Sequence, residues 1–340
     1  MKIRPVLGLI AALALPASLP VYAQSSSSRP GEPEGMAAAR DALKQKEGDT
    51  DQTTLLQQTL TAVDKQYSLL KRGKVAVTYD FNYSYIGQEK INADLSSGQL
   101  TLFNIENDSS HTITNTLAAD YGVLDNLTAS FSVPLVSKYS QNPTFDGTSH
   151  SIGDIALGAR YQPFETRRGQ PSMTFNGSLR LPTGRSPFKV QADQGLATGS
   201  GSAALTAGIN VNHIVDPVAL FGSLSFTYSA PASHLSQVRG NRILARVEPG
   251  MSIGFGIGFA YALSYNISTS LSLQETISAG SKLRFADGTE VKTQTQTAGV
   301  LTFGLGYRVS PKTTINITAG VGLTPDAPNF SIGVNLPIDF

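Results

Sequence analysis

The sequence predicts an all-β protein, a twelve-stranded antiparallel transmembrane β-barrel preceded by a short N-terminal helical segment. Three observations predict it: apolar residues alternate with small or polar ones in twelve separate runs, the connections alternate in length, and the last run ends on Phe340. Successive side chains of a strand point to opposite faces. The last run, 329–340, therefore has one wholly apolar face, as a strand between lipid and an aqueous lumen requires. Its apolar positions are Phe330, Ile332, Val334, Leu336, Ile338 and Phe340.

The composition is typical of strands with small side chains. The 340 residues include 32 glycines, 15% of the residues are charged, and the net charge is +1. A net charge near zero argues against nucleic acid as a partner. The absence of cysteine excludes disulfides and thiolate metal sites. No stretch approaches the roughly 20 apolar residues of a membrane-spanning helix.

Residues 1–23 have the features of a secretory signal peptide. Lys2 and Arg4 form a basic start, an apolar run from Val6 to Leu15 follows, and Val21-Tyr22-Ala23 is a small-residue cleavage site. The run is too short to span a membrane, and an uncleaved N-terminal anchor is the alternative. We therefore expect an exported chain whose mature form begins near Gln24.

Two further segments precede the barrel. Residues 24–50 predict a disordered and partly helical linker, because Ser, Pro, Gly and Glu give way to helix-forming residues. Residues 51–73 predict an amphipathic helix, whose apolar spacing of 4, 3, 4 and 3 is that of a heptad seam. A coiled coil, a helix lying on a neighbour and a plug in the lumen remain alternatives, and we expect this segment to gate the pore. The seam consists of Leu56, Leu60, Val63, Tyr67 and Leu70.

Residues 74–340 form the predicted barrel. Each run is near the length of about 9–11 residues that a tilted spanning strand needs. The expected strands are 74–86, 112–121, 127–135, 155–161, 173–181, 203–211, 218–228, 251–261, 269–273, 301–307, 315–323 and 329–340.

The connections predict which end of the barrel faces the periplasm. They are mostly short after even-numbered strands, at 122–126, 214–217 and 310–312, and mostly long after odd-numbered ones, at 87–110, 140–151, 183–199, 230–249 and 278–294. Short periplasmic turns and long outer loops are typical of outer-membrane barrels. Aromatic residues at the strand ends predict two interfacial girdles. These are Tyr121, Tyr161, Tyr261, Tyr307 and Phe340 on the periplasmic side, and Tyr83, Tyr85, Tyr139 and Tyr228 on the outer side.

The proposed lipid face carries a single charged residue, Glu275. A charge at the bilayer midplane costs about 2–4 kcal/mol for Lys or Arg and less for Asp or Glu. We therefore expect Glu275 either at the outer rim or beneath a neighbouring subunit. A soluble β-sandwich is the alternative fold, and it explains the alternation but not the girdles or the terminal phenylalanine.

The inward face predicts a polar lumen with few charges. Its small residues include the stripe Gly254, Gly256 and Gly258, which predicts strong curvature or the close approach of another group. Acidic and basic candidates are balanced, so no strong ion preference follows. The lumen-lining candidates are Asp80, Asp120, Lys138, Asp154, Arg160, Arg180 and Arg308.

The sequence contains one candidate catalytic pair, in His234-Leu235-Ser236, whose spacing matches the His-x-Ser pair of barrel phospholipases. The pair lies in a proposed loop next to Pro231, and spacing alone cannot establish a triad. We therefore expect no catalytic site, no cofactor and no metal site.

Several turn and strand-edge motifs resemble a known family. They are Gly153-Asp154, Leu181-Pro182-Thr183-Gly184, Val215-Asp216-Pro217 and Leu323-Thr324-Pro325-Asp326-Ala327-Pro328. The resemblance is to Gram-negative outer-membrane transporters that include proteins labelled for the phenol meta-pathway, and the layout is most similar to the Fap functional-amyloid exporter. It covers residues 74–340 and implies a trimeric twelve-stranded barrel with an N-terminal coiled coil and a helical plug.

The expected function is that of a channel in the outer membrane of a Gram-negative bacterium, exporting an extended polypeptide such as a functional amyloid subunit. The alternatives are a passive channel for small, aromatic or hydrophobic, molecules and a closed structural or adhesive barrel. Expected partners are outer-membrane lipid, the cargo, two further copies of the chain in a homotrimer, and the barrel assembly machinery, which would recognise Phe340.

Overall fold

The computed structural model describes residues 69–94, 102–142, 145–164, 170–190, 195–215, 218–239, 242–264, 266–310 and 313–338. The predicted signal peptide, the linker and all but the end of the amphipathic helix lie outside these residues, as does Phe340. Among the described residues, no helix is long and apolar enough to cross a membrane.

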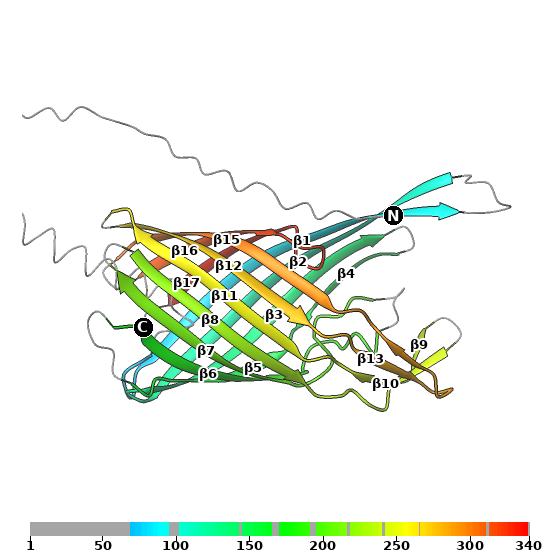
Figure 1. Ribbon diagram of the computed structural model, residues 1–340, viewed down its shortest axis with the longest axis horizontal. Coiled ribbons are helices and arrows are strands. Elements are labelled where there is room, and N and C mark those ends of the chain that lie inside the picture. The colour runs from blue at the N-terminus through cyan, green and yellow to red at the C-terminus, as the bar shows by residue number, and fades with distance from the viewer. Residues whose placement is uncertain are drawn as a thin grey trace, which may run out of the picture. The chain divides into compact units, whose positions relative to one another are not determined.

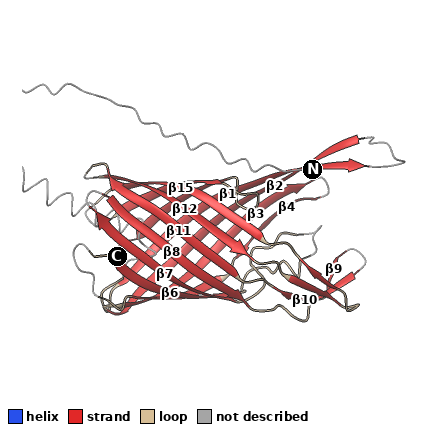
Figure 2. Cartoon of the chain, viewed as in Figure 1, coloured by secondary structure: helices blue, strands red, loops and turns tan. Residues whose placement is uncertain are grey.

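The described chain folds into a closed antiparallel β-barrel (Figure 1). One sheet of thirteen strands runs in the order β2-β1-β17-β16-β15-β12-β11-β8-β7-β6-β5-β3-β4, and β2 also pairs with β3. The sheet therefore closes on itself, and the first strand, β1, is paired with the last, β17. β4 and β5 both pair with β3, β4 along its outer part and β5 along its periplasmic part, so together they occupy one position in the ring. The ring therefore has twelve strands, as the sequence predicts. Figure 2 shows the strands crossing the barrel at a common tilt.

The thirteen labelled strands of this sheet follow one another along the chain, interrupted only by the outer segments described below. Their bounds are β1 Val75–Asp94, β2 Leu102–Leu124, β3 Leu127–Asn142, β4 Phe145–Ile152, β5 Ile155–Tyr161, β6 Ser172–Leu181, β7 Ala204–Val215, β8 Val218–Ser229, β11 Ser252–Ala262, β12 Ile267–Ser278, β15 Gln296–Arg308, β16 Thr314–Gly322 and β17 Phe330–Ile338.

The two faces of the wall follow the alternation in the sequence. On β11, Ile257 is 62% exposed on the outside, whereas its near neighbour Ala260 is fully buried on the inside. The same alternation of exposed apolar and covered small residues recurs along β7, β8 and β15. A soluble sandwich would bury its apolar face, so these exposed side chains form the lipid-facing belt of a membrane barrel.

The predicted outer loops contain further strands. β1 and β2 stay paired beyond the barrel as far as Asp94 and Leu102, and the predicted loop 140–151 is largely the hairpin of β3 and β4. Loops 230–249 and 278–294 together form a separate four-stranded sheet, β14-β13-β10-β9. Its strands are β9 Gln237–Arg239, β10 Arg242–Glu248, β13 Lys282–Phe285 and β14 Glu290–Lys292. Strands outside the bilayer have no lipid-facing side, so apolar and polar residues need not alternate along them. The alternation in the sequence therefore did not reveal these strands.

Glu275 lies three residues before the outer end of β12, opposite Phe255 of β11 and Gly299 of β15. This position supports the rim alternative, because a carboxylate near the bilayer surface costs less than one at the midplane. The alternative of a subunit interface stays a prediction.

A charge on either face of one strand pair should distinguish lipid from lumen. We expect Ile257→Arg to lower the free energy of unfolding by about 2–4 kcal/mol, because its side chain faces lipid. The matched control is Ser272→Arg on β12, whose parent side chain borders the lumen cavity. Denaturant titration in lipid vesicles measures both changes, and equal destabilisation would contradict the assignment of the faces.

Candidate functional site: the barrel lumen

The lumen contains a cavity of about 720 Å³ lined mainly by small polar residues. A further cavity of about 360 Å³ adjoins it, since both include Arg160 and Gln274 in their linings. Alternate residues of every strand point away from lipid and into the lumen. Serines, threonines and glycines occupy most of these inward positions. The barrel therefore encloses an aqueous space rather than an apolar core.

Three of the predicted lumen charges border the larger cavity: Asp80, Asp120 and Arg160. Arg160 Nη2 lies 2.8 Å from Asp120 Oδ2, and both side chains are largely buried in the wall. The Asn335 side-chain amide donates a hydrogen bond to Asp80 Oδ1. The charge of Asp120 is thus compensated by a cation, whereas Asp80 is bonded to a neutral amide.

The other predicted lumen charges lie toward the two ends of the barrel. Lys138 is at an inward position near the outer end of β3, and Arg180 is next to the last residue of β6. Arg308 ends β15 on the side of the short turns, where its Nε donates to the Ser310 carbonyl at 3.3 Å. The sequence-predicted charges therefore form a central group and two peripheral ones.

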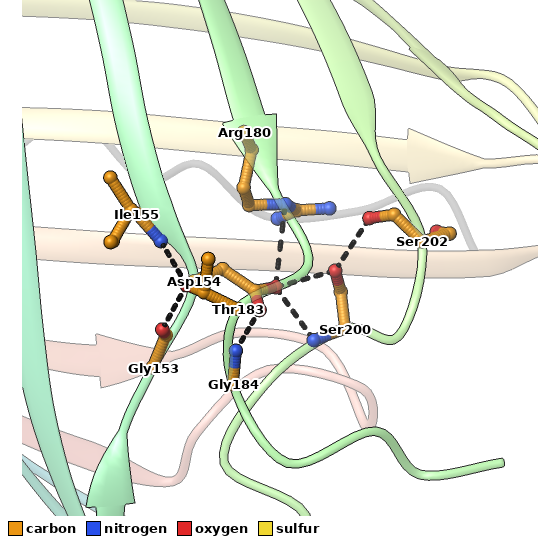
Figure 3. A network of polar contacts seen from close by, with 8 residues as sticks. All are labelled: Gly153, Asp154, Ile155, Arg180, Thr183, Gly184, Ser200 and Ser202. Carbon is orange, nitrogen blue, oxygen red and sulfur yellow. Dashed lines mark hydrogen bonds and ion pairs between the residues drawn. The ribbon is translucent and has the colours of Figure 1, made fainter. Parts of the chain in front are cut away.

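Asp154 lies at the bend between β4 and β5, where it holds the segment that follows β6 (Figure 3). Its Oδ1 accepts a hydrogen bond from the Gly184 amide at 3.1 Å, and its Oδ2 accepts from the Ser200 amide at 2.7 Å and the Ser200 hydroxyl at 2.6 Å. Arg180 Nε is 3.9 Å away. Asp154 is only 7% exposed, so its carboxylate serves as an anchor with little surface left for a solute.

The neighbouring motif residues complete the same network. The Thr183 hydroxyl donates to the Gly153 carbonyl at 2.8 Å and accepts from the Ile155 amide at 3.0 Å. A Cβ on Gly184 would lie 2.7 Å from the Gly199 Cα, and one on Gly199 would collide with the Asp154 carboxylate. Glycine is therefore required where the two loop segments meet. The Gly153-Asp154 and Leu181-Pro182-Thr183-Gly184 motifs are two halves of one contact.

The motif at 323–328 forms a second contact on the outer rim. The Thr324 hydroxyl accepts a hydrogen bond from the Gly299 amide at 2.8 Å, and Asp326 Oδ2 accepts one from the Thr297 amide at 2.9 Å. Both amides belong to the first residues of β15. The turn between β16 and β17 thus satisfies backbone donors of β15 beyond the last residue of its partner strand.

The glycine stripe on β11 accommodates side chains of the adjacent strand β8. A Cβ at Gly254 would lie 2.7 Å from Ser225 Oγ, one at Gly256 would lie 2.7 Å from Ser223 Oγ, and one at Gly258 would overlap the Phe221 ring. The stripe thus leaves room for side chains of the neighbouring strand, which neither of the two predicted explanations had named. Phe221 is absent from the predicted lumen residues. The signal was available, since Leu220 and Leu224 on the lipid face place Phe221 on the opposite one.

The chain enters β1 through a turn at the periplasmic mouth. The Lys74 amide bonds to the Lys71 carbonyl at 3.0 Å, and Gly73 has a φ of 74°. The Leu70 amide donates to the Thr128 hydroxyl at 2.9 Å, and Thr128 is fully buried on the inward face of β3. Leu70 therefore lies against the lumen wall. The rest of the predicted seam, Leu56, Leu60, Val63 and Tyr67, is outside the described residues.

The histidines do not assemble a catalytic or metal site in the part of the chain that the structure describes. His234 Nδ1 is 3.2 Å from Ser233 Oγ, and no contact with Ser236 joins the predicted pair. His111 faces outward, where its Nδ1 is 2.9 Å from the Tyr83 hydroxyl and its ring lies near Tyr85 and Tyr139. Within the described ranges no three metal-ligating residues come together.

The closed twelve-stranded ring and its exposed apolar belt together define an outer-membrane β-barrel. The chain belongs to the family described as "Putative MetA-pathway of phenol degradation", whose model matches residues 94–340. In fold it is similar to an outer-membrane channel from Pseudomonas putida F1, with 16% identity over 81% of this chain and 98% of the other and a TM-score of 0.62.

More distant similarities extend to two other outer-membrane barrels. The TodX monoaromatic hydrocarbon channel has 10% identity over 80% of this chain and 91% of its own, with a TM-score of 0.46. The translocator domain of NalP from Neisseria meningitidis has 12% identity over 90% and 98%, with a TM-score of 0.46. The match of the family model confirms the resemblance to proteins labelled for the phenol meta-pathway, and the similarity to the Fap exporter stays a prediction.

The Asp154 network predicts that the segment after β6 loosens when the charge is removed. Hydrogen bonds to a charged group contribute about 1.5–3 kcal/mol each, so Asp154→Asn should raise tryptic cleavage after Arg185 and Lys189 about tenfold or more. Limited proteolysis of intact cells measures the rate. Asp287→Asn, on an exposed turn of the outer sheet, is the control and should leave it unchanged. An unchanged rate in Asp154→Asn would contradict the anchoring role.

Proposed function

We propose that the protein is a passive channel for small molecules, including aromatic or hydrophobic ones, across the outer membrane. The observation that carries the proposal is the polar cavity of about 720 Å³ inside a closed barrel. A polar lumen lets a solute move without binding tightly, because water and wall hydroxyls exchange as its hydrogen-bond partners. The family description, which refers to phenol degradation, supports an aromatic solute.

Export of an extended polypeptide, our leading expectation from the sequence, has less support than this alternative. The expectation rested on a resemblance in layout, and the motifs quoted with that resemblance hold loops rather than cargo where the Asp154 network shows them. The lumen also carries fixed side chains, the Arg160–Asp120 pair on one part of the wall and Phe221 on another. A polypeptide passing through the lumen would encounter both the charged pair and the Phe221 ring, whereas a small molecule can pass between them.

Planar-bilayer recording tests the proposal. We expect purified protein to insert as discrete, ohmic conductance steps, because an aqueous lumen conducts salt in both directions. Heat-denatured wild-type protein added in the same detergent serves as the matched blank. Insertion without conductance would contradict a channel and would favour the closed structural or adhesive barrel.

We further propose that the segment preceding Leu69 restricts this pore. The position of Leu70 against Thr128 supports the idea, because it puts the start of the described chain on the inward face of the wall. Deleting residues 24–68, which keeps the turn at 71–74, should raise single-channel conductance while the barrel still folds. The control is a version in which the same segment is replaced by a Gly/Ser linker of equal length. Unchanged conductance after deletion would favour a helix docked in the periplasm.

A further inference from the structure

Phe221 is the one aromatic residue at an inward position among the described residues of the twelve ring strands. Its strand partners are Asn212 of β7 and Gly258 of β11, both on the lumen side. The neighbours of Phe221 on β8 that face lipid are Leu220, Leu224 and Phe226, each strongly exposed. Phe81 and Phe131 also border the cavity, but they occupy outward positions in the register. This aromatic ring is therefore an exception in a lumen lined mostly by serine, threonine and glycine.

The surrounding wall is shaped to hold this ring. Phe221 packs against Ala219 and Ala260, both fully buried, and it occupies the space that any side chain at Gly258 would fill. Small residues at three neighbouring positions thus create a seat in the wall. Because the seat restricts the ring, an aromatic contact made there loses little side-chain entropy on binding.

A hydrogen-bonding group lies across the lumen from the ring. β1 and β8 are six strands apart in either direction around the twelve-stranded ring, so Asp80 and Phe221 belong to opposite sides of the wall. Both border the same cavity of about 720 Å³. Asp80 is bonded to the Asn335 amide, and a carboxylate has further lone pairs that can accept from a solute. The Arg160–Asp120 pair of the same cavity is already internally compensated.

We propose that Phe221 is a stacking site for small aromatic solutes and that Asp80, on the opposite side of the same cavity, attracts those that carry a positive charge, such as protonated aromatic amines. The inference deepens the proposed channel function and rests on it. The Phe221 ring can make an offset-stacked or edge-to-face contact with an aromatic ring. A saturated ring of similar size makes a weaker contact because it has no π-system. The Asp80 carboxylate attracts the positive charge of such a solute from the opposite wall of the cavity.

Current block in planar bilayers tests the subsite. The probes are 2-phenylethylammonium and 2-cyclohexylethylammonium, which match in charge and approximate size but differ in the aromatic ring. We expect the aromatic probe to block the wild-type current with about two- to tenfold higher affinity. Phe221→Leu should abolish this difference, since leucine keeps an apolar side chain without a π-system. Phe226→Leu, on the lipid face of the same strand, should preserve it.

Asp80 is tested with the same two probes. Asp80→Asn should lower the affinity of both ammonium compounds by about two- to fivefold and leave their ratio unchanged. Equal block by the two probes in wild type, or a preserved preference in Phe221→Leu, would overturn the aromatic part of the proposal. Unchanged affinities in Asp80→Asn would overturn the part played by the carboxylate.

A binding measurement separates failure of the subsite from failure of the channel. The chain has no tryptophan, so Phe221→Trp introduces a single reporter, and Phe226→Trp is its control. In detergent-solubilised protein, we expect 2-phenylethylammonium to change the fluorescence of Trp at position 221 saturably and that at position 226 not at all. A saturable change without conductance would refute the channel and retain the subsite as a binding site. No saturable change at position 221 would overturn the subsite even in a conducting channel.

Discussion

The pairing of β1 with β17 is the interaction on which the rest of the structure depends. Lipid offers no hydrogen-bond partners, so an open sheet edge in the bilayer would leave rows of backbone N–H and C=O groups unsatisfied. The register runs from Val77 opposite Ile338 to Tyr85 opposite Phe330 and joins the first strand to the last. Closure then separates one lipid-facing surface from one lumen, and every inward residue is placed by its register.

The outer rim shows how the barrel continues where the bilayer no longer imposes this requirement. Strands there extend beyond their partners, and their free amides are satisfied by side chains instead. Thr324 and Asp326 accept from β15, and Asp154 accepts from the segment that follows β6. Three of the four motifs that suggested the family lie at these points, because Thr, Asp and Gly combine short acceptors with close backbone approach.

The lumen is defined by complementary sizes on adjacent strands. Wherever β11 has an inward glycine, β8 supplies a larger side chain that covers it, and Ser268 and Ser270 of β12 cover Gly306 and Gly304 of β15 in the same way. This packing leaves a continuous wall whose few large or charged groups stand out. Arg160 and Asp120 neutralise one another, whereas Asp80 is bonded to a neutral amide, and all three line the same cavity as Phe221.

The sequence by itself determined the fold class, the number of barrel strands, the face of nearly every residue and the end of the barrel that has the short turns. All of these depend on a period of two and on the contrast between lipid and water, which are local properties of the chain. Only the tertiary structure decided which residues distant in sequence come into contact, such as Asp154 with Ser200 or Asp120 with Arg160. It also decided the strands of the outer sheet, because pairing outside the bilayer depends on partners distant in sequence and leaves no alternation between lipid and water.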